Sequence, residues 1–130
     1  MMVYVHIPFC LSKCPYCDFT SFAWADALVP GYLEALQSEM DSWLESRRTD
    51  VPVSSVYIGG GTPSILTPTQ IGAILDGIRA RFGLQPDAEV TVEINPATWK
   101  GDAMREAVQR GVTRLSLGIQ SLEDDVLEVL

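Results

Sequence analysis

The chain lacks a fourth cysteine. Its 130 residues contain three, Cys10, Cys14 and Cys17, which are crowded into one short stretch near the N-terminus. An odd number of closely spaced cysteines fits poorly with a disulfide framework and better with metal ligation in a reducing compartment. We therefore expect these thiols to bind metal rather than one another.

Positive charge and long hydrophobic runs are also scarce. Nine Lys and Arg residues against 17 Asp and Glu residues give a formal net charge of −8. This balance argues against general binding to nucleic acid or to an anionic membrane surface. No segment approaches the roughly 20 apolar residues of a membrane span, and the N-terminus shows no secretory signal pattern. We expect a cytoplasmic protein with no nucleic-acid partner and no membrane span.

Short β-branched runs alternate with longer helical patterns along the chain. Strands are expected at residues 2–7, 53–58, 89–95 and 113–119, and helices near 30–48, 68–82, 102–110 and 122–130. Thr67 and Gln70 form a capping box around Pro68, which fixes the start of the second helix. Four strand–helix repeats with short connections predict an α/β fold built from parallel βαβ units.

Alternation within the strands separates an apolar face from a polar one. In the first strand Val5 and Ile7 share one face, while Tyr4 and His6 share the other. A sheet covered by helices on both faces would be apolar on both. The pattern favours a curved, TIM-like barrel sheet whose concave polar face lines a ligand cavity. An open sheet with one solvated face is the alternative.

About four βα units make only part of a TIM-like barrel. Both edge strands of such a sheet would stay unpaired. After Ser121, a candidate helix cap, the last helix has room for only about two turns. We expect residues 1–130 to form a single, incomplete domain that is the N-terminal part of a longer barrel.

The spacing CxxxCxxC allows one loop to direct Cys10, Cys14 and Cys17 at three corners of a cubane [4Fe-4S] cluster. The fourth iron would remain free for a ligand that is not protein. Three other interpretations remain open. His6 would complete a structural zinc site, a ferredoxin-type cluster would need a fourth cysteine that the sequence does not contain, and the thiols would otherwise be unligated.

A glycine-rich segment follows the second expected strand. Gly60 and Gly61 permit close backbone approach and leave main-chain groups exposed beside Thr62, where a ligand ammonium group would find acceptors. A phosphate loop is the first alternative, although neither the Walker lysine nor a GxGxxG pattern is present. A plain turn is the second.

Polar side chains also mark the third and fourth strands. Glu93 faces inward on the third strand and Gln120 ends the fourth, and both side chains suit the hydroxyls of a nucleoside. An ion pair between Glu93 and Arg114 is the structural alternative. Tyr4 and Tyr16 are either ligand contacts or ordinary packing residues.

The segment from Tyr4 to Cys10, followed by CxxxCxxC, resembles the radical S-adenosylmethionine (SAM) superfamily, and the resemblance covers essentially the whole chain. It is greatest for the branch that contains oxygen-independent coproporphyrinogen oxidase and HemW-type haem chaperones. In this superfamily the amino and carboxylate groups of SAM's methionine part chelate the free iron, and an electron from the cluster cleaves SAM to methionine and a 5′-deoxyadenosyl radical. The resemblance implies that the three cysteines bind the cluster. It implies SAM contacts from Tyr4, Tyr16, Gly60, Gly61, Thr62, Glu93 and Gln120.

Position 19 distinguishes two kinds of relative. The coproporphyrinogen-oxidising members carry a further cysteine where this chain has Phe19. The resemblance therefore implies a HemW-like haem chaperone that oxidises coproporphyrinogen III little or not at all. A radical SAM oxidoreductase of porphyrin biosynthesis is the alternative, and a cluster-free interaction module is a third. The first two would require a reducing electron donor and would bind haem or a porphyrin.

Overall fold

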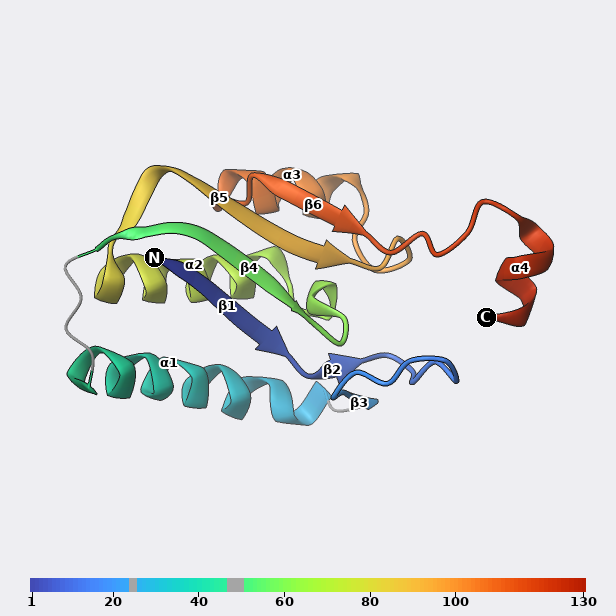
Figure 1. Ribbon diagram of the computed structural model, residues 1–130, viewed down its shortest axis with the longest axis horizontal. Helices are drawn as coiled ribbons and strands as arrows, with labels where there is room; N and C mark the ends of the chain where they lie inside the picture. Colours follow the sequence, from blue (N-terminus) through green and yellow to red (C-terminus); the bar gives the residue numbers. More distant parts are fainter. Residues whose placement is uncertain (24–25, 47–50) are drawn as a thin grey trace.

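The computed structural model describes residues 1–23, 26–46 and 51–130. Its main sheet has four parallel strands in the order β1-β4-β5-β6. They are β1 (Met2–Ile7), β4 (Val53–Gly60), β5 (Leu84–Ile94) and β6 (Arg114–Leu117). All four arrows point the same way, so their carboxyl ends meet at one edge of the sheet (Figure 1).

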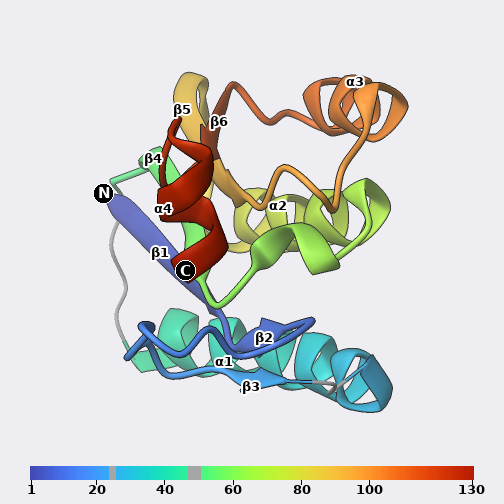
Figure 2. The same cartoon turned by 90° about the vertical axis from the view of Figure 1, so that its right-hand side faces the viewer.

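Helices α1 (Val29–Ser46), α2 (Pro68–Phe82) and α3 (Gly101–Gln109) connect these strands and lie on one side of the sheet (Figure 2). A last helix, α4 (Asp124–Val129), follows β6. Two short 3-10 helices, η1 (Asp26–Leu28) and η2 (Pro63–Ile65), precede α1 and α2. The predicted α/β fold with four βα units and a parallel sheet is confirmed.

The core forms between the helices and the apolar face of the sheet. Val5 and Ile7 of β1 and Ile58 of β4 are buried there against Ile74 and Ile78 of α2. These strand residues have the parity that the alternation assigned to the apolar face. The predicted division of the sheet into two faces is therefore confirmed.

One buried residue lies on the polar face. Thr91 of β5 is only 1% exposed, although it shares the parity of Glu93. Its hydroxyl accepts a hydrogen bond of 2.8 Å from Nε of Arg114, whose guanidinium group also pairs with Glu89 at 3.1 Å. The polar face is therefore packed near the start of β6.

Several predicted boundaries were wrong. β5 begins at Leu84, before the predicted start, because the chain turns at Gly83 (φ 68°) directly after α2. β6 ends at Leu117, before the predicted end, and the hydrogen bond of 3.0 Å from Gly118 N–H to the carbonyl of Ile94 completes its pairing with β5. Positions 47–48, where the first helix was expected to end, lie outside the described residues.

The capping box of α2 is confirmed. The Thr67 hydroxyl accepts from Gln70 N–H at 3.2 Å, and the Gln70 side chain accepts from Thr67 N–H at 2.8 Å. Ser121 does not cap α4, whose N-cap is Glu123; the Ser121 hydroxyl instead accepts from Glu123 N–H at 3.0 Å. The last helix consequently starts later than predicted.

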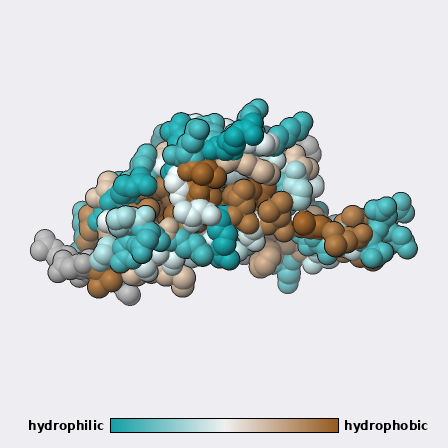
Figure 3. Space-filling model, turned by 90° about the horizontal axis from the view of Figure 1, so that it is seen from above, coloured by the Kyte–Doolittle hydropathy of each residue, from teal (hydrophilic) through white to brown (hydrophobic). Residues whose placement is uncertain are grey.

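Helix α4 projects beyond the carboxyl edge of the sheet (Figure 1). Its apolar side chains and those of the preceding segment are largely exposed, among them Leu122 and Val129. Figure 3 shows a strip of hydrophobic surface that continues into this projection. Within the described ranges no helix is long and apolar enough to cross a membrane.

The complete burial of Ile74 leads to a prediction about the free energy of unfolding. Ile74 is fully buried between α2 and the sheet, so Ile74→Ala should lower the free energy of unfolding by about 2–5 kcal/mol, measured by urea denaturation. Val108→Ala on exposed α3 is the control and should change it by less than about 0.5 kcal/mol. Equal effects of the two substitutions would contradict this description of the core.

Candidate iron–sulfur and cofactor site

The loop that carries Cys10, Cys14 and Cys17, here called the cysteine loop, follows the carboxyl end of β1. Its first residues form β2 (Phe9–Cys10), which pairs in parallel with β3 (Phe22–Ala23). Phe22 N–H also donates to the carbonyl of Pro8 at 2.7 Å. The two ends of the loop are therefore held together at the edge of the sheet.

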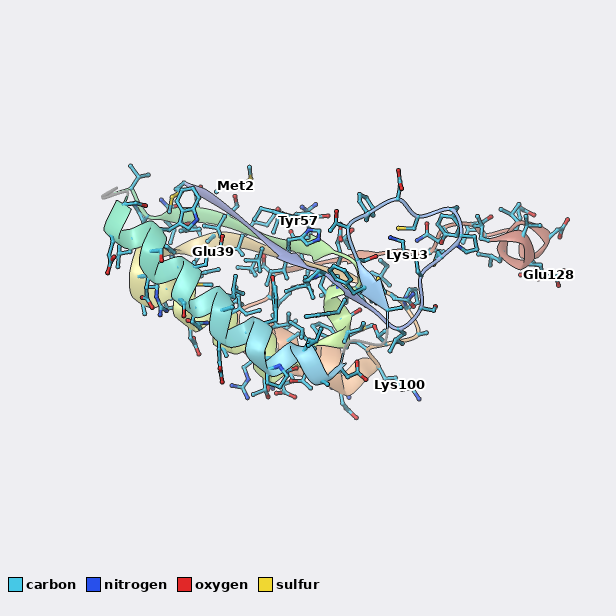
Figure 4. The ribbon with its side chains drawn as sticks, turned by 90° about the horizontal axis from the view of Figure 1, so that it is seen from below. Met2, Lys13, Glu39, Tyr57, Lys100 and Glu128 are labelled. Atoms are coloured by element: carbon cyan, nitrogen blue, oxygen red, sulfur yellow. The ribbon has the colours of Figure 1, made fainter. Side chains whose placement is uncertain are left out.

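Two side chains fasten the returning half of the loop. The Lys13 ammonium group donates to the carbonyl of Phe19 at 2.9 Å, and Nε2 of His6 donates to the carbonyl of Thr20 at 2.9 Å. A carbonyl oxygen only accepts, so Nε2 carries the proton and Nδ1 of His6 accepts from the Tyr4 hydroxyl at 3.0 Å. Figure 4 shows Lys13 within this loop.

The zinc interpretation fails on this geometry. Both ring nitrogens of His6 are engaged in hydrogen bonds, one with Tyr4 and the other with Thr20. In the part of the chain that the structure describes, no three His, Cys, Asp or Glu side chains are close enough to hold a single metal ion. Ligands of a cubane cluster bind different irons, so they do not need to converge on one point.

A cavity of about 350 Å³ lies between the cysteine loop and the carboxyl ends of β4, β5 and β6. Nearly all residues that the sequence predicted for the site line it together. They are Cys10, Cys14, Cys17, Tyr16, Gly60, Gly61, Thr62, Glu93 and Gln120. Tyr4 is absent from this lining; it contacts His6 and Tyr57, and Tyr57 in turn bonds to Glu93.

The glycine segment fits tightly against the cysteine loop. A Cβ on Gly61 would lie 2.6 Å from the carbonyl oxygen of Phe9 and 2.9 Å from Sγ of Cys10. Gly61 N–H donates to Ile7 and Thr62 N–H to Phe9, at 2.8 and 2.7 Å. Only a glycine allows this approach, because any side chain would enter the space beside the thiol.

The chemistry of this donor set fits an iron–sulfur cluster. The three thiols are half-buried and free of disulfides, and they border one cavity without converging on a single point. Soft thiolates are the preferred ligands of such clusters. The residues present are therefore compatible with a cluster that has three protein ligands.

Glu93 does not form the alternative ion pair with Arg114. Its Oε1 accepts from the Tyr57 hydroxyl at 2.6 Å, and its Oε2 accepts from Gly60 N–H at 3.2 Å. Arg114 instead contacts Glu89 and Thr91. The Glu93 carboxylate therefore lies at the cavity without a cationic partner among the contacts described.

Gln120 adopts an unusual backbone conformation. Its φ of 68° lies in the left-handed region, which a residue other than glycine rarely occupies. Gly118 makes room for it, because a Cβ there would lie 2.9 Å from Nε2 of Gln120. Such strain is concentrated at functional sites, and this strained residue borders the cavity.

The sequence analysis missed Tyr57, Asn95 and Ser116. Asn95 and Ser116 line the cavity at the ends of β5 and β6. Tyr57 lies outside the cavity lining, and its hydroxyl donates a hydrogen bond to Glu93. The second expected strand carried the necessary signal, since Ser55 and Tyr57 alternate with the buried Val56 and Ile58 as the polar faces of the other strands do.

The two tyrosines of the polar face remain neutral donors. The Tyr4 ring stacks on that of Tyr57, with 6.1 Å between centroids. The hydrogen bond to Glu93, together with partial burial, raises the pKa of Tyr57 above its usual value. Burial and the nearby Glu93 charge raise the pKa of Tyr4. Both hydroxyls consequently keep their protons at neutral pH.

Comparison with known proteins agrees with this geometry. Residues 4–130 match the Radical SAM superfamily. The chain is 40% identical to "Heme chaperone HemW" of Escherichia coli (strain K12), covering 100% of this chain and 34% of that protein. It is 42% identical to "Heme chaperone HemW" of Mycobacterium tuberculosis (strain H37Rv), covering 98% of this chain and 33% of that protein.

A solved structure has the same fold. It is described as "Coproporphyrinogen III oxidase (HemN) from Escherichia coli is a Radical SAM enzyme", and it superposes with a TM-score of 0.86 at 30% identity. The superposition covers 98% of this chain and 30% of that one. The chain spans about a third of the length of the curated relatives it matches. On the match over residues 4–130, the chain belongs to the radical SAM superfamily.

Proposed function

We propose that Cys10, Cys14 and Cys17 hold a [4Fe-4S] cluster and leave one iron free for SAM. The observation that carries this proposal is the contact between the cysteine loop and the glycine segment. Gly61 lies so close to Phe9 and Cys10 that only a glycine fits there, and both Gly61 and Cys10 border the cavity. Membership of the radical SAM superfamily supports the same assignment.

In this proposal the carboxyl edge of the sheet holds SAM. The main chain at Gly60, Gly61 and Thr62 receives the methionine ammonium group, and Glu93 and Gln120 bind the ribose hydroxyls. All five residues border the cavity. Parallel α/β sheets bind ligands at this edge, where the loops of neighbouring strands meet.

The remaining predicted residues act around the cavity. Tyr16 lies on the loop between two of the thiols and borders the cavity, where it would shield the cluster or contact adenine. Tyr4 orients His6, which in turn holds the loop at Thr20. When bound, the reduced cluster supplies the electron that cleaves SAM. The chain's own contribution is to position the two groups and to exclude water.

For the whole protein we propose a HemW-like haem chaperone of the cytoplasm, supplied with electrons by a reducing donor. Two kinds of observation support it: the names of the HemW relatives, and Phe19, which is 68% exposed on the cysteine loop. The family resemblance implies a cysteine at that position in the relatives that oxidise coproporphyrinogen. A chaperone would retain the cluster and capture haem without turning over a porphyrinogen.

The second candidate is a radical SAM oxidoreductase that acts on coproporphyrinogen III. The likeness to the solved HemN structure favours it, since the superposition covers nearly the whole chain at 30% identity. The two candidates share the cluster and SAM and differ in the second small molecule. They are therefore separated by what the loaded protein does to haem and to the porphyrinogen.

Cluster ligation can be tested by removing one thiol. Cys14→Ser in the full-length protein should lower cluster-bound iron severalfold after anaerobic reconstitution, because serine is a poor ligand for these irons. The measurement is iron and acid-labile sulfide per chain, with Ser12→Ala, also on the loop, as the control. Unchanged iron and sulfide in the Cys14 variant would refute the cluster assignment.

The glycine contact gives a second test. Gly61→Ala should reduce both cluster content and SAM affinity, because the new methyl group would press on a backbone carbonyl that cannot move freely. We expect a rise in the SAM dissociation constant of at least about tenfold, measured by equilibrium dialysis. The matched control is Gly31→Ala on α1, where an added Cβ meets nothing within 4 Å. If the Gly61 and Gly31 variants behave alike, the proposed cavity is not the SAM site.

The choice between chaperone and oxidase needs the reconstituted full-length protein. We expect it to capture haem in a stoichiometric complex, detected by absorption spectroscopy, and to form no protoporphyrinogen when given coproporphyrinogen III, SAM and a reductant. The control is a HemN enzyme assayed in parallel. Sustained protoporphyrinogen formation would establish the second candidate instead.

A further inference from the structure

Tyr57 is outside the cavity but touches the group that faces it. Its hydroxyl donates to Oε1 of Glu93 at 2.6 Å, which is a short bond of the charge-assisted kind. Gly60 N–H donates to the other carboxylate oxygen at 3.2 Å. Figure 4 shows Tyr57 on the side of the sheet away from α1. The Glu93 carboxylate is therefore held at both oxygens by β4.

The absence of a side chain at Gly59 leaves room for the side chains of Tyr57 and Glu93. A Cβ on Gly59 would lie 2.8 Å from Cε1 of Tyr57 and 3.0 Å from Oε2 of Glu93. Its φ is not in the left-handed region, so backbone conformation alone does not require glycine here. The close approach of the two side chains does require it.

The Tyr57 ring is itself fixed from the other side. Tyr4 on β1 pairs with Tyr57 in the strand register, and their rings are stacked at an interplanar angle of 26°. The raised pKa of the Tyr57 hydroxyl, caused first by its hydrogen bond to Glu93, keeps it a donor across neutral pH. Because its ring is stacked and its hydroxyl stays protonated, Tyr57 holds the Glu93 carboxylate in one orientation.

We propose that Tyr57 is a positioning residue for SAM, which acts by fixing the plane of the Glu93 carboxylate. A carboxylate has about four lone-pair sites, and Tyr57 and Gly60 occupy one on each oxygen. The remaining sites are left for the ribose hydroxyls on the cavity side. This inference rests on the proposed function, in which Glu93 binds that ribose.

A general structural role for Tyr57 makes a different prediction. If its hydroxyl only stabilised the sheet, its removal would weaken ligand binding whether or not Glu93 were present. If it acts through the carboxylate, its removal should have no effect once Glu93 can no longer accept both bonds. The two roles are thus separated by a double-mutant cycle.

The test uses the full-length protein with its reconstituted cluster and measures the SAM dissociation constant by equilibrium dialysis. We expect Tyr57→Phe to raise this constant about five- to tenfold and Glu93→Ala, which removes every acceptor of the Tyr57 hydroxyl at this position, to raise it at least about tenfold. The double variant should match Glu93→Ala within about twofold. Iron content is measured for every variant, so that binding is compared at equal cluster occupancy.

A second tyrosine serves as the matched control. Tyr32 of α1 is half-buried, and its hydroxyl donates to the backbone oxygen of His6. Tyr32→Phe should leave the SAM dissociation constant within about twofold, since it removes a tyrosine bond of the same neighbourhood without touching Glu93. A loss as large as that of the Tyr57 variant would mean general loosening and would overturn the inference.

The remaining outcomes are also decisive. Equal losses from Tyr57→Phe in the presence and absence of the Glu93 carboxylate, or no loss at all, would overturn the positioning role and leave the SAM site intact. Unchanged affinity in Glu93→Ala would instead remove Glu93 from the SAM site and the inference with it. The failure of the inference and the failure of this part of the proposed function are therefore distinguishable.

Discussion

The backbone after β4 lies directly against the backbone after β1, and the candidate site depends on this contact. Gly61 and Thr62 donate to the carbonyls of Ile7 and Phe9, so the glycine segment continues the parallel pairing beyond the ends of the strands. Parallel strands place consecutive loops at one edge. The hydrogen bonds bring these two loops into contact, and the absence of a side chain at Gly61 allows it.

The two faces of the sheet have separate tasks. The apolar face packs on α1, α2 and α3 and supplies the stability that burial of large aliphatic side chains provides. The other face carries hydrogen-bonding groups, which are satisfied by one another near the start of β6 and at Tyr57 and Glu93. Binding groups on a rigid, already packed sheet are held more precisely than groups on loops alone. Ligand contacts can therefore vary on one face with little cost to the core.

Much of this arrangement could be predicted from the sequence, because its signals are local. Strand alternation, the capping box at Thr67, the cysteine spacing and the family resemblance predicted the α/β units, the two faces and nine of the residues that line the cavity. The strand ends could not be predicted, since they depend on how far each strand pairs with its neighbour, as β6 does with β5. Neither could the bond between Tyr57 and Glu93. It joins two strands far apart in sequence, and only their register brings the side chains together.

The loop itself is held by contacts that need no metal. Lys13 and His6 fasten its returning half through the carbonyls of Phe19 and Thr20, and the β2–β3 pair closes its base. Ordering a free loop around a cluster would cost conformational entropy for each residue fixed. Because these bonds already restrict the loop, less of that cost would remain for a cluster to offset. The same bonds occupy both ring nitrogens of His6, so in this arrangement its ring shapes the loop that presents the thiols and offers no free nitrogen as a fourth ligand.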